Sequence, residues 1–302
     1  MNAETERPAG KDALRKPPES FLVIVNPSAG GDKRRLAKDV AARLTKGGRS
    51  VSLEIAAGPG EIRRLAEAAR ADAVLVAGGD GSINEAVCGL LARPTSRPAL
   101  GVIPQGTVNV LMRELGLPED ASALADIFLR GETKPLHIGR ANGAPFLLMA
   151  SAGLDAAVVE TVDLGLKRKI GRLAYAVSAA KVLARGGFPD VEAQTEAGVL
   201  RAKCVVVSNA KHYGGGFVID RSANVTRPGL SLVALTEISP RATLALMRYF
   251  LTGALDGAGC VRKLATRRVT IRGEGAAQID GDYLGRMPVE ICAGDETLDI
   301  LA

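Results

Sequence analysis

Short apolar runs alternate with segments of helical spacing in the first half of the chain. The apolar runs are bounded by turns that contain glycine, proline or asparagine, a pattern typical of a parallel sheet buried on both faces. Three strand, turn and helix repeats therefore predict an α/β domain with helices on both sides of the sheet. The predicted elements are strands at 21–25, 50–56, 73–77 and 99–103, and helices at 33–46, at 60–71, from Ser82 to about Ala92, and after residue 107.

After His137 the pattern changes to short β-like stretches, which predict a second, mostly antiparallel domain. We therefore expect a disordered tail at 1–19, a nucleotide-type α/β domain at 20–136 and a β-rich substrate domain at 137–302, whose C-terminal segment could pack back on the first domain. The second half contains β-like stretches at 145–151, 189–195, 199–209, 230–236, 267–272 and 286–292, and helical patterns at about 165–185 and 240–253.

Composition narrows the class of protein. The 302 residues are 47% hydrophobic and 24% charged, as in soluble globular proteins. No apolar run approaches the ~18 residues that cross a bilayer, and the first nineteen residues lack the apolar core of a secretory signal, so we expect a cytoplasmic protein. Four scattered cysteines form no CxxC pair, which disfavours disulfides and zinc, and only two histidines are present. The chemistry is therefore expected to rely on carboxylates.

The net charge of +6 is concentrated in two basic clusters, at 167–172 and 262–272. Such clusters contact phosphate groups, nucleic acid or anionic membranes, or are simply solvated faces. Nucleic acid is disfavoured, because aromatic residues make up 3% of the chain and Trp is absent. The first cluster accompanies an apolar stripe at helical spacing, which either packs on a core or lies at an anionic membrane surface.

Glycine-containing turns follow three of the predicted strands: Asn26 to Gly31, Gly78 to Ser82 and Pro104 to Thr107. Ligands of open parallel sheets bind beyond the carboxyl ends of the strands, so we expect these turns to form one site. Each turn could need glycine for structural reasons alone, but glycine also lets backbone N–H groups approach a phosphate. Asp80 would repel phosphates unless a cation lay between them, so we expect Mg²⁺ nearby. The chain lacks GxxxxGK[ST], which excludes a P-loop protein.

Five stretches together resemble one family. GGDGSINEAV at 78–87 closely resembles the GGDGTxNEV signature of the diacylglycerol kinase catalytic-domain superfamily, which includes bacterial lipid kinases, sphingosine kinases and ceramide kinases. The resemblance extends over about residues 20 to 302 and implies an NAD-kinase-like parallel-sheet nucleotide domain plus a mostly antiparallel β-sandwich domain, with the nucleotide cleft between them. The other similar stretches are VNPSAGG at 25–31, PQGTVN at 104–109, SAGLDA at 151–156 followed by KRKIGRLAY at 167–175, and DGD at 280–282.

The resemblance also implies a site for ATP and Mg²⁺. Asp80 would act on the metal through a water molecule, and Asn84 and Glu85 would support the loop from the first turn of its helix. An alternative for Glu85 is an ordinary helix N-terminal carboxylate, favoured by the dipole. The implied nucleotide-binding residues are Asn26, Pro27, Ser28, Gly30, Gly79, Asp80, Gly81, Ser82, Asn84, Glu85, Gly106 and Thr107.

Asp282 stands where the family has the Glu of its DGE stretch, which implies that it takes the proton from the lipid hydroxyl. Its side chain is one methylene shorter, so either the backbone lies closer or a water intervenes. Asp280 is the next candidate for the base. The alternative for both is a plain β-turn, in which Asp and Gly are favoured anyway.

Three departures from the family pattern concern accessory contacts. Val110 replaces an acidic residue of many relatives. Residues 226–229 lack an acidic turn that binds a structural metal in Gram-positive relatives, so we expect that metal site to be absent. Ala56 and Ala57 replace a nucleotide-contacting Thr of some relatives.

These observations favour an ATP-dependent lipid kinase that acts on the primary hydroxyl of a membrane lipid of the diacylglycerol or ceramide type. It would contact the anionic inner face of the membrane peripherally. The alternatives are an NAD-kinase-like small-molecule kinase, which shares the GGDG turn, and a catalytically silent regulator that binds nucleotide or lipid.

Overall fold

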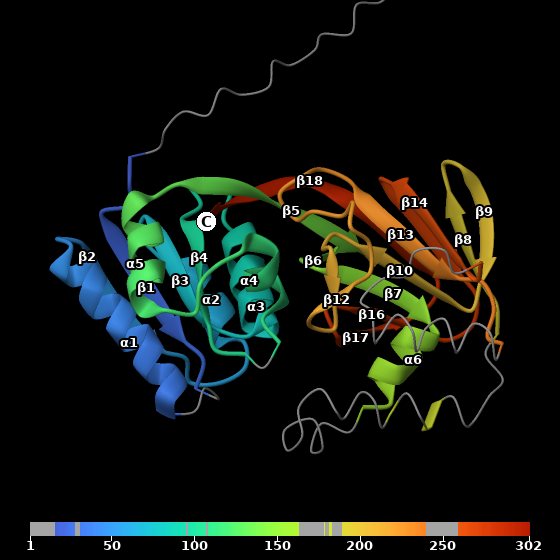
Figure 1. The fold of residues 1–302 in the computed structure, drawn as a ribbon, viewed down its shortest axis with the longest axis horizontal. Helices are drawn as coiled ribbons and strands as arrows, with labels where there is room; N and C mark the ends of the chain where they lie inside the picture. Colours follow the sequence, from blue (N-terminus) through green and yellow to red (C-terminus); the bar gives the residue numbers. More distant parts are fainter. Residues whose placement is uncertain are drawn as a thin grey trace, which may run out of the picture.

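Two halves of different construction lie side by side (Figure 1). One is built of helices around a parallel sheet and the other mainly of strands. The computed structural model describes residues 16–27, 31–94, 96–106, 108–162, 178, 181–182, 189–239 and 259–302.

The first half is a sheet between two layers of helices. Its strands lie in the order β2-β1-β3-β4 and all pair in parallel. Every residue of β3 and β4 is buried, because α1 and α5 pack together on one face and α2 and α3 on the other. The elements are β1 (Ser20–Val25), α1 (Gly31–Lys46), β2 (Ser50–Ile55), α2 (Glu61–Ala68), β3 (Ala73–Gly78), α3 (Asp80–Leu91), β4 (Ala99–Pro104), α4 (Val110–Leu115) and α5 (Ala121–Arg130).

The second half is a sandwich of two sheets around its own core. A six-stranded antiparallel sheet, β14-β13-β10-β7-β16-β17, forms one layer, and strands β5, β6, β8, β9, β15 and β18 form the other. The elements are β5 (Thr133–Ala141), β6 (Ala144–Phe146), β7 (Met149–Gly153), α6 (Leu154–Glu160), β8 (Val191–Thr195), β9 (Gly198–Ala202), β10 (Cys204–Ser208), β11 (His212–Tyr213), β12 (Phe217–Val218), β13 (Leu230–Leu235), β14 (Val261–Thr266), β15 (Arg268–Arg272), β16 (Ala276–Ile279), β17 (Asp282–Arg286) and β18 (Val289–Leu301).

Strand β18 joins the two halves. Its first residues pair antiparallel with β15, and from Ile291 to Leu301 it pairs antiparallel with β5. Near its end Ile300 also pairs in parallel with Leu100 of β4. One ten-stranded sheet therefore runs from β2 at one edge of the molecule to β9 at the other. This shared sheet fixes how the second half faces the turns that follow β1, β3 and β4.

The predicted fold class is confirmed, with a parallel α/β half and a mostly antiparallel β-sandwich. Helix α3 begins at Asp80 rather than Ser82, because the extended backbone of Gly79 (φ −94°) leads directly into the helix. The stretch at 199–209 is two strands, since the chain passes from one sheet to the other at Lys203.

Other parts of the sequence-based prediction missed a strand or concern residues that the structure does not describe. Strand β5 was not predicted, because its sequence contains proline and several polar residues, and residue 137, expected as the domain boundary, lies inside it. The boundary therefore remains a proposal. The tail up to residue 15 and nearly all of both helical patterns, at 165–185 and 240–253, lie outside the described residues.

Candidate active site

The three glycine-containing turns lie together at one edge of the parallel sheet, where β1, β3 and β4 end. The Asn26 side chain donates from Nδ2 to Ser82 Oγ at 2.6 Å, which joins the first turn to the second. The second and third turns touch through glycine, since a Cβ on Gly106 would lie 2.7 Å from the Cα of Gly79. No residue with a side chain fits at that contact without displacing backbone, so both glycines have a packing role.

The third turn is closed by a residue that the sequence-based site did not include. Asn109 has positive φ (48°), and its Oδ1 accepts from Gly106 N at 2.8 Å while its Nδ2 donates to Gly106 O at 3.0 Å. Asparagine is one of the few residues that tolerate this backbone conformation. The last residue of PQGTVN therefore shapes the turn, a role that the motif alone did not reveal.

The Asp80 carboxylate lies at the start of α4. Its two oxygens accept from the backbone N–H groups of Val110, at 3.0 Å, and Leu111, at 3.1 Å. Burial raises the pKa of Asp80, and these two donors partly offset that effect. Position 110 contributes its backbone N–H to this link, so the replacement of an acidic residue by Val110 leaves the link intact.

The described part of the site offers a magnesium ion one carboxylate, that of Asp80, rather than a full set of protein ligands. Within the described residues, no three His, Cys, Asp or Glu side chains gather into a group that could hold a metal ion. Mg²⁺ bound to nucleotide commonly keeps several waters and takes only one or two protein carboxylates, with the phosphates as further ligands. Asp80 accepts backbone hydrogen bonds from Val110, Leu111 and its own N–H, and a carboxylate has about four lone-pair sites, so one remains for a metal-bound water and the residue fits that mode of binding.

The Asp280 carboxylate, a candidate base from the sequence, is buried and accepts four hydrogen bonds. Its Oδ2 accepts from Asn84 Nδ2 at 2.6 Å and from Leu147 N at 2.8 Å. Its Oδ1 accepts from the N–H groups of Leu148, at 2.8 Å, and Met149, at 3.0 Å. Burial raises the pKa of Asp280, and the four donors lower it in part. Both lone pairs of each oxygen are used, so Asp280 has no free lone pair with which to act as a base.

Asp282 differs from Asp280 in its exposure and in its hydrogen bonding. It is exposed at the start of the edge strand β17, and its carboxylate makes no hydrogen bond or ion pair with the described part of the chain. Asp280 and Gly281 between the two strands have positive φ (49° and 87°), as a two-residue hairpin turn of type I′ requires. Asp280 contacts Asn84 of α3, the helix that follows the second glycine turn. The Cα of Asp282 lies within roughly 8 Å of the Cα of Asp280, because only one residue separates them in the chain.

Of the remaining predicted residues, the structure describes some, and others lie outside the described residues. Asn84 holds the Asp280 turn. Glu85 Oε1 accepts from Gly60 N, so its hydrogen bond supports the loop that leads into α2 and not the glycine turn that the resemblance implied. Gly81 lies in the first turn of α3, exposed, with open space where a Cβ would be. Ser28, Gly30 and Thr107, and the basic cluster at 167–172, lie outside the described residues.

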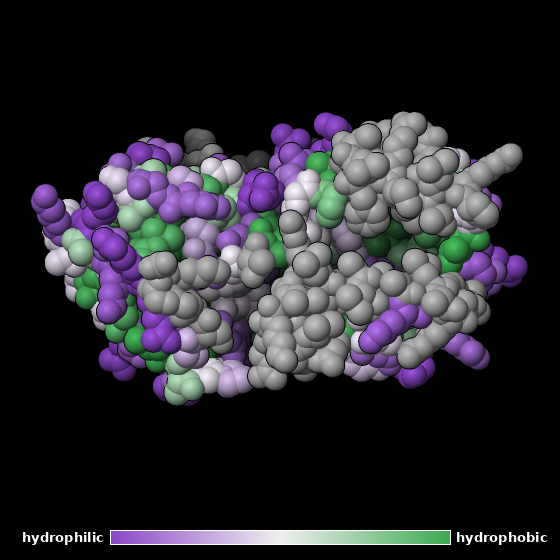
Figure 2. All heavy atoms as spheres, turned by 60° about the horizontal axis from the view of Figure 1, so that its bottom comes forward, coloured by the Kyte–Doolittle hydropathy of each residue, from purple (hydrophilic) through white to green (hydrophobic). Residues whose placement is uncertain are grey.

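Arg34 is a further residue that the sequence reasoning missed. Its guanidinium donates to the carbonyl oxygen of Pro27 at 2.5 Å, which brings a fixed positive charge from α1 to the first turn. A basic residue shortly after a glycine-containing turn was the signal available in the sequence. Figure 2 turns this edge of the molecule forward and shows many hydrophilic side chains over the first half.

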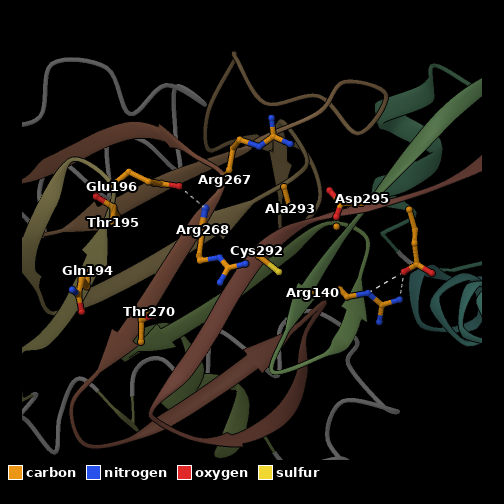
Figure 3. A pocket seen from close by; sticks show the side chains of 12 residues that line it. Arg140, Gln194, Thr195, Glu196, Arg267, Arg268, Thr270, Cys292, Ala293 and Asp295 are labelled. Carbon is orange, nitrogen blue, oxygen red and sulfur yellow. Dashed lines mark hydrogen bonds and ion pairs between the residues drawn. The ribbon is translucent and has the colours of Figure 1, made fainter. Parts of the chain in front are cut away.

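A large concave surface lies elsewhere, on the outer face of the sandwich (Figure 3). Its volume is about 800 Å³, and its lining comes from β5, β8, β15, β18 and their connections, with none of the glycine turns. Arg140 forms an ion pair with Glu296, and Arg268 pairs with Glu290 at 3.0 Å. Three arginines face three carboxylates in the lining, so the surface has no net charge that would select a phosphate. The arginines are Arg140, Arg267 and Arg268, and the carboxylates are Glu196, Asp295 and Glu296.

Family models match both halves of the chain. The diacylglycerol kinase catalytic domain matches residues 20–141, and the YegS C-terminal NAD kinase beta sandwich-like domain matches residues 149–302. The chain belongs to the diacylglycerol kinase catalytic-domain family. This is a family of lipid kinases, and the chain is an enzyme of that phosphotransferase class.

Individual relatives span nearly the whole chain. A diacylglycerol kinase of Bacillus subtilis (strain 168) is 28% identical over 278 residues, with 89% of this chain and 91% of the relative covered. A diacylglycerol kinase of Staphylococcus aureus (strain bovine RF122 / ET3-1) is 25% identical over 292 residues, covering 93% and 91%. The resemblance seen in five motifs is thereby confirmed for the family as a whole.

Solved structures share the fold. A crystal structure from Bacillus anthracis str. Sterne superposes with a TM-score of 0.80 at 22% identity, covering 97% of this chain and 98% of the other. A diacylglycerol kinase from the same strain superposes with a TM-score of 0.72 at 20% identity, covering 95% and 98%. The arrangement of the two halves is therefore shared with these solved structures.

Proposed function

We propose that this protein transfers the γ-phosphoryl group of ATP to the primary hydroxyl of a membrane lipid of the diacylglycerol or ceramide type. The observation that carries the proposal is the hydrogen bond between Asn84 and Asp280. It ties the helix that follows the glycine turn to the hairpin turn that bears Asp282, although the two residues are 196 positions apart in the chain. The nucleotide-type turn and the hairpin that carries the exposed Asp282 are thus linked through Asn84 and Asp280, which supports a shared site.

The phosphate-binding role rests on the glycine turn and the start of α3. The first N–H groups of a helix lack partners within the helix, and the dipole favours an anion at that end. The exposed Gly81 leaves room for a phosphate to approach those groups. Mg²⁺, when bound, would neutralise charge on the transferring phosphate, and Asp80 is the residue that would hold it through water.

The proton-transfer role is given to Asp282. Its carboxylate would accept the proton of the lipid hydroxyl while the hydroxyl oxygen bonds to the γ-phosphorus. The bond from that phosphorus to the bridging oxygen breaks, and ADP leaves. Phosphoryl transfer depends mainly on positioning and charge neutralisation, which a rigid turn and a helix N-terminus both supply.

The proposal also requires the protein to reach a substrate that lies in the membrane. In the described part of the chain, no helix has both the length and the apolar character needed to span a bilayer. We place the protein at the cytoplasmic face of the membrane, in peripheral contact through the basic cluster at 167–172. Each basic residue near an anionic surface contributes ~1 kcal/mol, screened by salt.

Gly81 offers a test of the nucleotide site that separates binding from folding. Gly81→Ala introduces a Cβ into open space, so the free energy of unfolding should stay the same or rise by up to ~1 kcal/mol, the difference in helix propensity. ATP affinity should fall by about tenfold or more, ~1.4 kcal/mol, because the Cβ occupies the space through which the phosphate reaches the backbone. Thermal unfolding and equilibrium ATP binding measure the two effects.

The matched control is Gly216→Ala, at another exposed glycine with open space around its Cβ position, in the β11–β12 hairpin. It should leave ATP affinity unchanged. Gly79 suits the test less well, because a Cβ there would lie 3.1 Å from the Cα of Gly106 and disturb the third turn. If Gly81→Ala binds ATP as tightly as the unmodified protein, the phosphate does not lie over this turn.

A further inference from the structure

The hairpin turn that carries Asp282 is anchored from a second side, away from Asn84. Gln278 of β16 is only 2% exposed, and its Oε1 accepts from the N–H of Gly281 at 2.8 Å. Its Nε2 donates to Ser151 Oγ at 2.9 Å and to Asp155 Oδ2 at 3.1 Å. The amide of Gln278 therefore bridges the hairpin turn and a cluster formed by β7 and α6.

The chemistry of that cluster dictates which way the Gln278 amide points. A carboxylate can only accept hydrogen bonds, and Asp155 accepts from Ser151 Oγ, Tyr213 OH and Gln278 Nε2. Because the Ser151 hydroxyl donates to Asp155, only its lone pairs remain for Gln278. Both neighbours thus require the nitrogen end of the amide, and the oxygen end must face Gly281.

The consequence is a turn held at both of its central residues. The Asp280 side chain binds Asn84 and the N–H groups of residues 147–149, while the Gly281 N–H binds Gln278. Gly281 directly precedes Asp282 in the chain. The direction in which Asp282 leaves the turn therefore depends on the Gln278 hydrogen bond.

We propose that Asp155 and Gln278 are positioning residues for Asp282: Asp155 fixes the orientation of the Gln278 amide, and the amide oxygen fixes the Asp280–Gly281 peptide, one residue before Asp282. The proposal rests on the proposed function, in which Asp282 accepts the proton. A general base works only within hydrogen-bond reach of its proton, and catalytic groups must be held within about 0.5 Å of the productive geometry. Loosening this peptide should therefore affect turnover and leave the nucleotide turn intact.

A reversal of hydrogen-bond polarity tests the proposal. Gln278→Glu alone places a second carboxylate beside Asp155. Asp155→Asn alone removes the charge that Ser151, Tyr213 and Gln278 share, and it sets an amide nitrogen either against the Gln278 nitrogen or against the Tyr213 hydroxyl, which must then accept instead of donate. The double variant Asp155→Asn/Gln278→Glu restores a consistent set of donors and acceptors. Asn at 155 donates to Ser151 and to Glu at 278, whose other oxygen accepts from Gly281. We expect each single variant to lower kcat on the best lipid substrate about tenfold or more, with KM for ATP within twofold, and the double variant to recover most of the loss.

A pair of serines controls for a general loss of stability. Ser151 and Ser231 are both nearly buried, at 1% and 5% exposure, on strands of the same sheet, and each donates its hydroxyl to an aspartate. Ser151→Ala and Ser231→Ala should lower the melting temperature by similar amounts. Only Ser151→Ala should lower kcat, because only Ser151 contacts the Gln278 amide.

Hydrogen exchange of the peptide that spans residues 276–286 provides a readout that does not depend on activity. Exchange there should speed up in Gln278→Glu and in Ser151→Ala, and return toward the unmodified rate in the double variant. Equal kcat for the two serine variants, or a double variant no better than its worse single, would overturn the proposal. An inactive unmodified protein would instead count against the proposed function, with the exchange rates still deciding whether Gln278 holds the turn.

Discussion

Asp282→Asn is expected to lower the turnover of lipid phosphorylation by roughly 10²–10⁴, the usual contribution of a positioned general base. Asparagine keeps the size of the side chain but cannot take the proton of the hydroxyl. ATP affinity should barely change, because the residue lies on the hairpin turn and not on the glycine turns. The measurement is steady-state kinetics on the best lipid substrate, beside equilibrium ATP binding.

Two companion variants sharpen this prediction. Asp282→Glu introduces the residue that the family pattern carries at this position and should retain substantial activity if position 282 holds the base. Asp80→Asn should behave differently and weaken the Mg²⁺ dependence and the use of ATP together. Near-normal turnover in Asp282→Asn would mean that the base lies elsewhere, and Asp280 would be a poor substitute because its lone pairs are already used.

Asp280→Ala is expected to be the most destabilising single change considered for this turn. It removes the acceptor of four donors, three of them backbone N–H groups that would be left without a protein partner. Removing one partner of a buried charged network costs about 3–5 kcal/mol. The free energy of unfolding from urea titration should fall by that order, with the melting temperature lower by about 6–20 °C.

Asp282→Ala is the matched control, since it changes the same residue type two positions further along the same turn. Asp282 is exposed and unbonded within the described chain, so its loss should change the free energy of unfolding by less than about 0.5 kcal/mol. The two aspartates should thus separate cleanly, with stability dependent on Asp280 and turnover on Asp282. Equal losses of stability in the two variants would contradict the roles assigned to them.

Sequence patterns predicted the parallel half of the fold well, and the reason is physical. The residues of β3 and β4 are apolar almost without interruption because helices cover both faces, and glycine turns mark their ends. Strand β5 escaped prediction because Pro135 and its polar neighbours break the pattern, and it is pairing with β18 that defines it. Local sequence records the apolar pattern of a buried strand, but it does not record which distant strand will pair with an irregular one.

The candidate site was predicted in outline for a similar reason. Parallel strands end at one edge of a sheet, so the turns after β1, β3 and β4 had to lie near one another. The different roles of Asp280 and Asp282 could not be predicted, because they depend on partners such as Asn84 and Leu147, which lie 196 and 133 positions away. Gln278 and Asp155 likewise gain their roles only when β7, α6 and β16 come together.

The most direct test of the proposed function is incubation of the purified protein with labelled ATP and Mg²⁺, in separate reactions with mixed micelles of diacylglycerol, ceramide or sphingosine, and with NAD as a soluble control. We predict label in the phosphorylated product of diacylglycerol or ceramide, none in NADP, and loss of the lipid product in Asp282→Asn. Label transferred to NAD, or to no acceptor at all by a folded protein that binds ATP, would contradict the account.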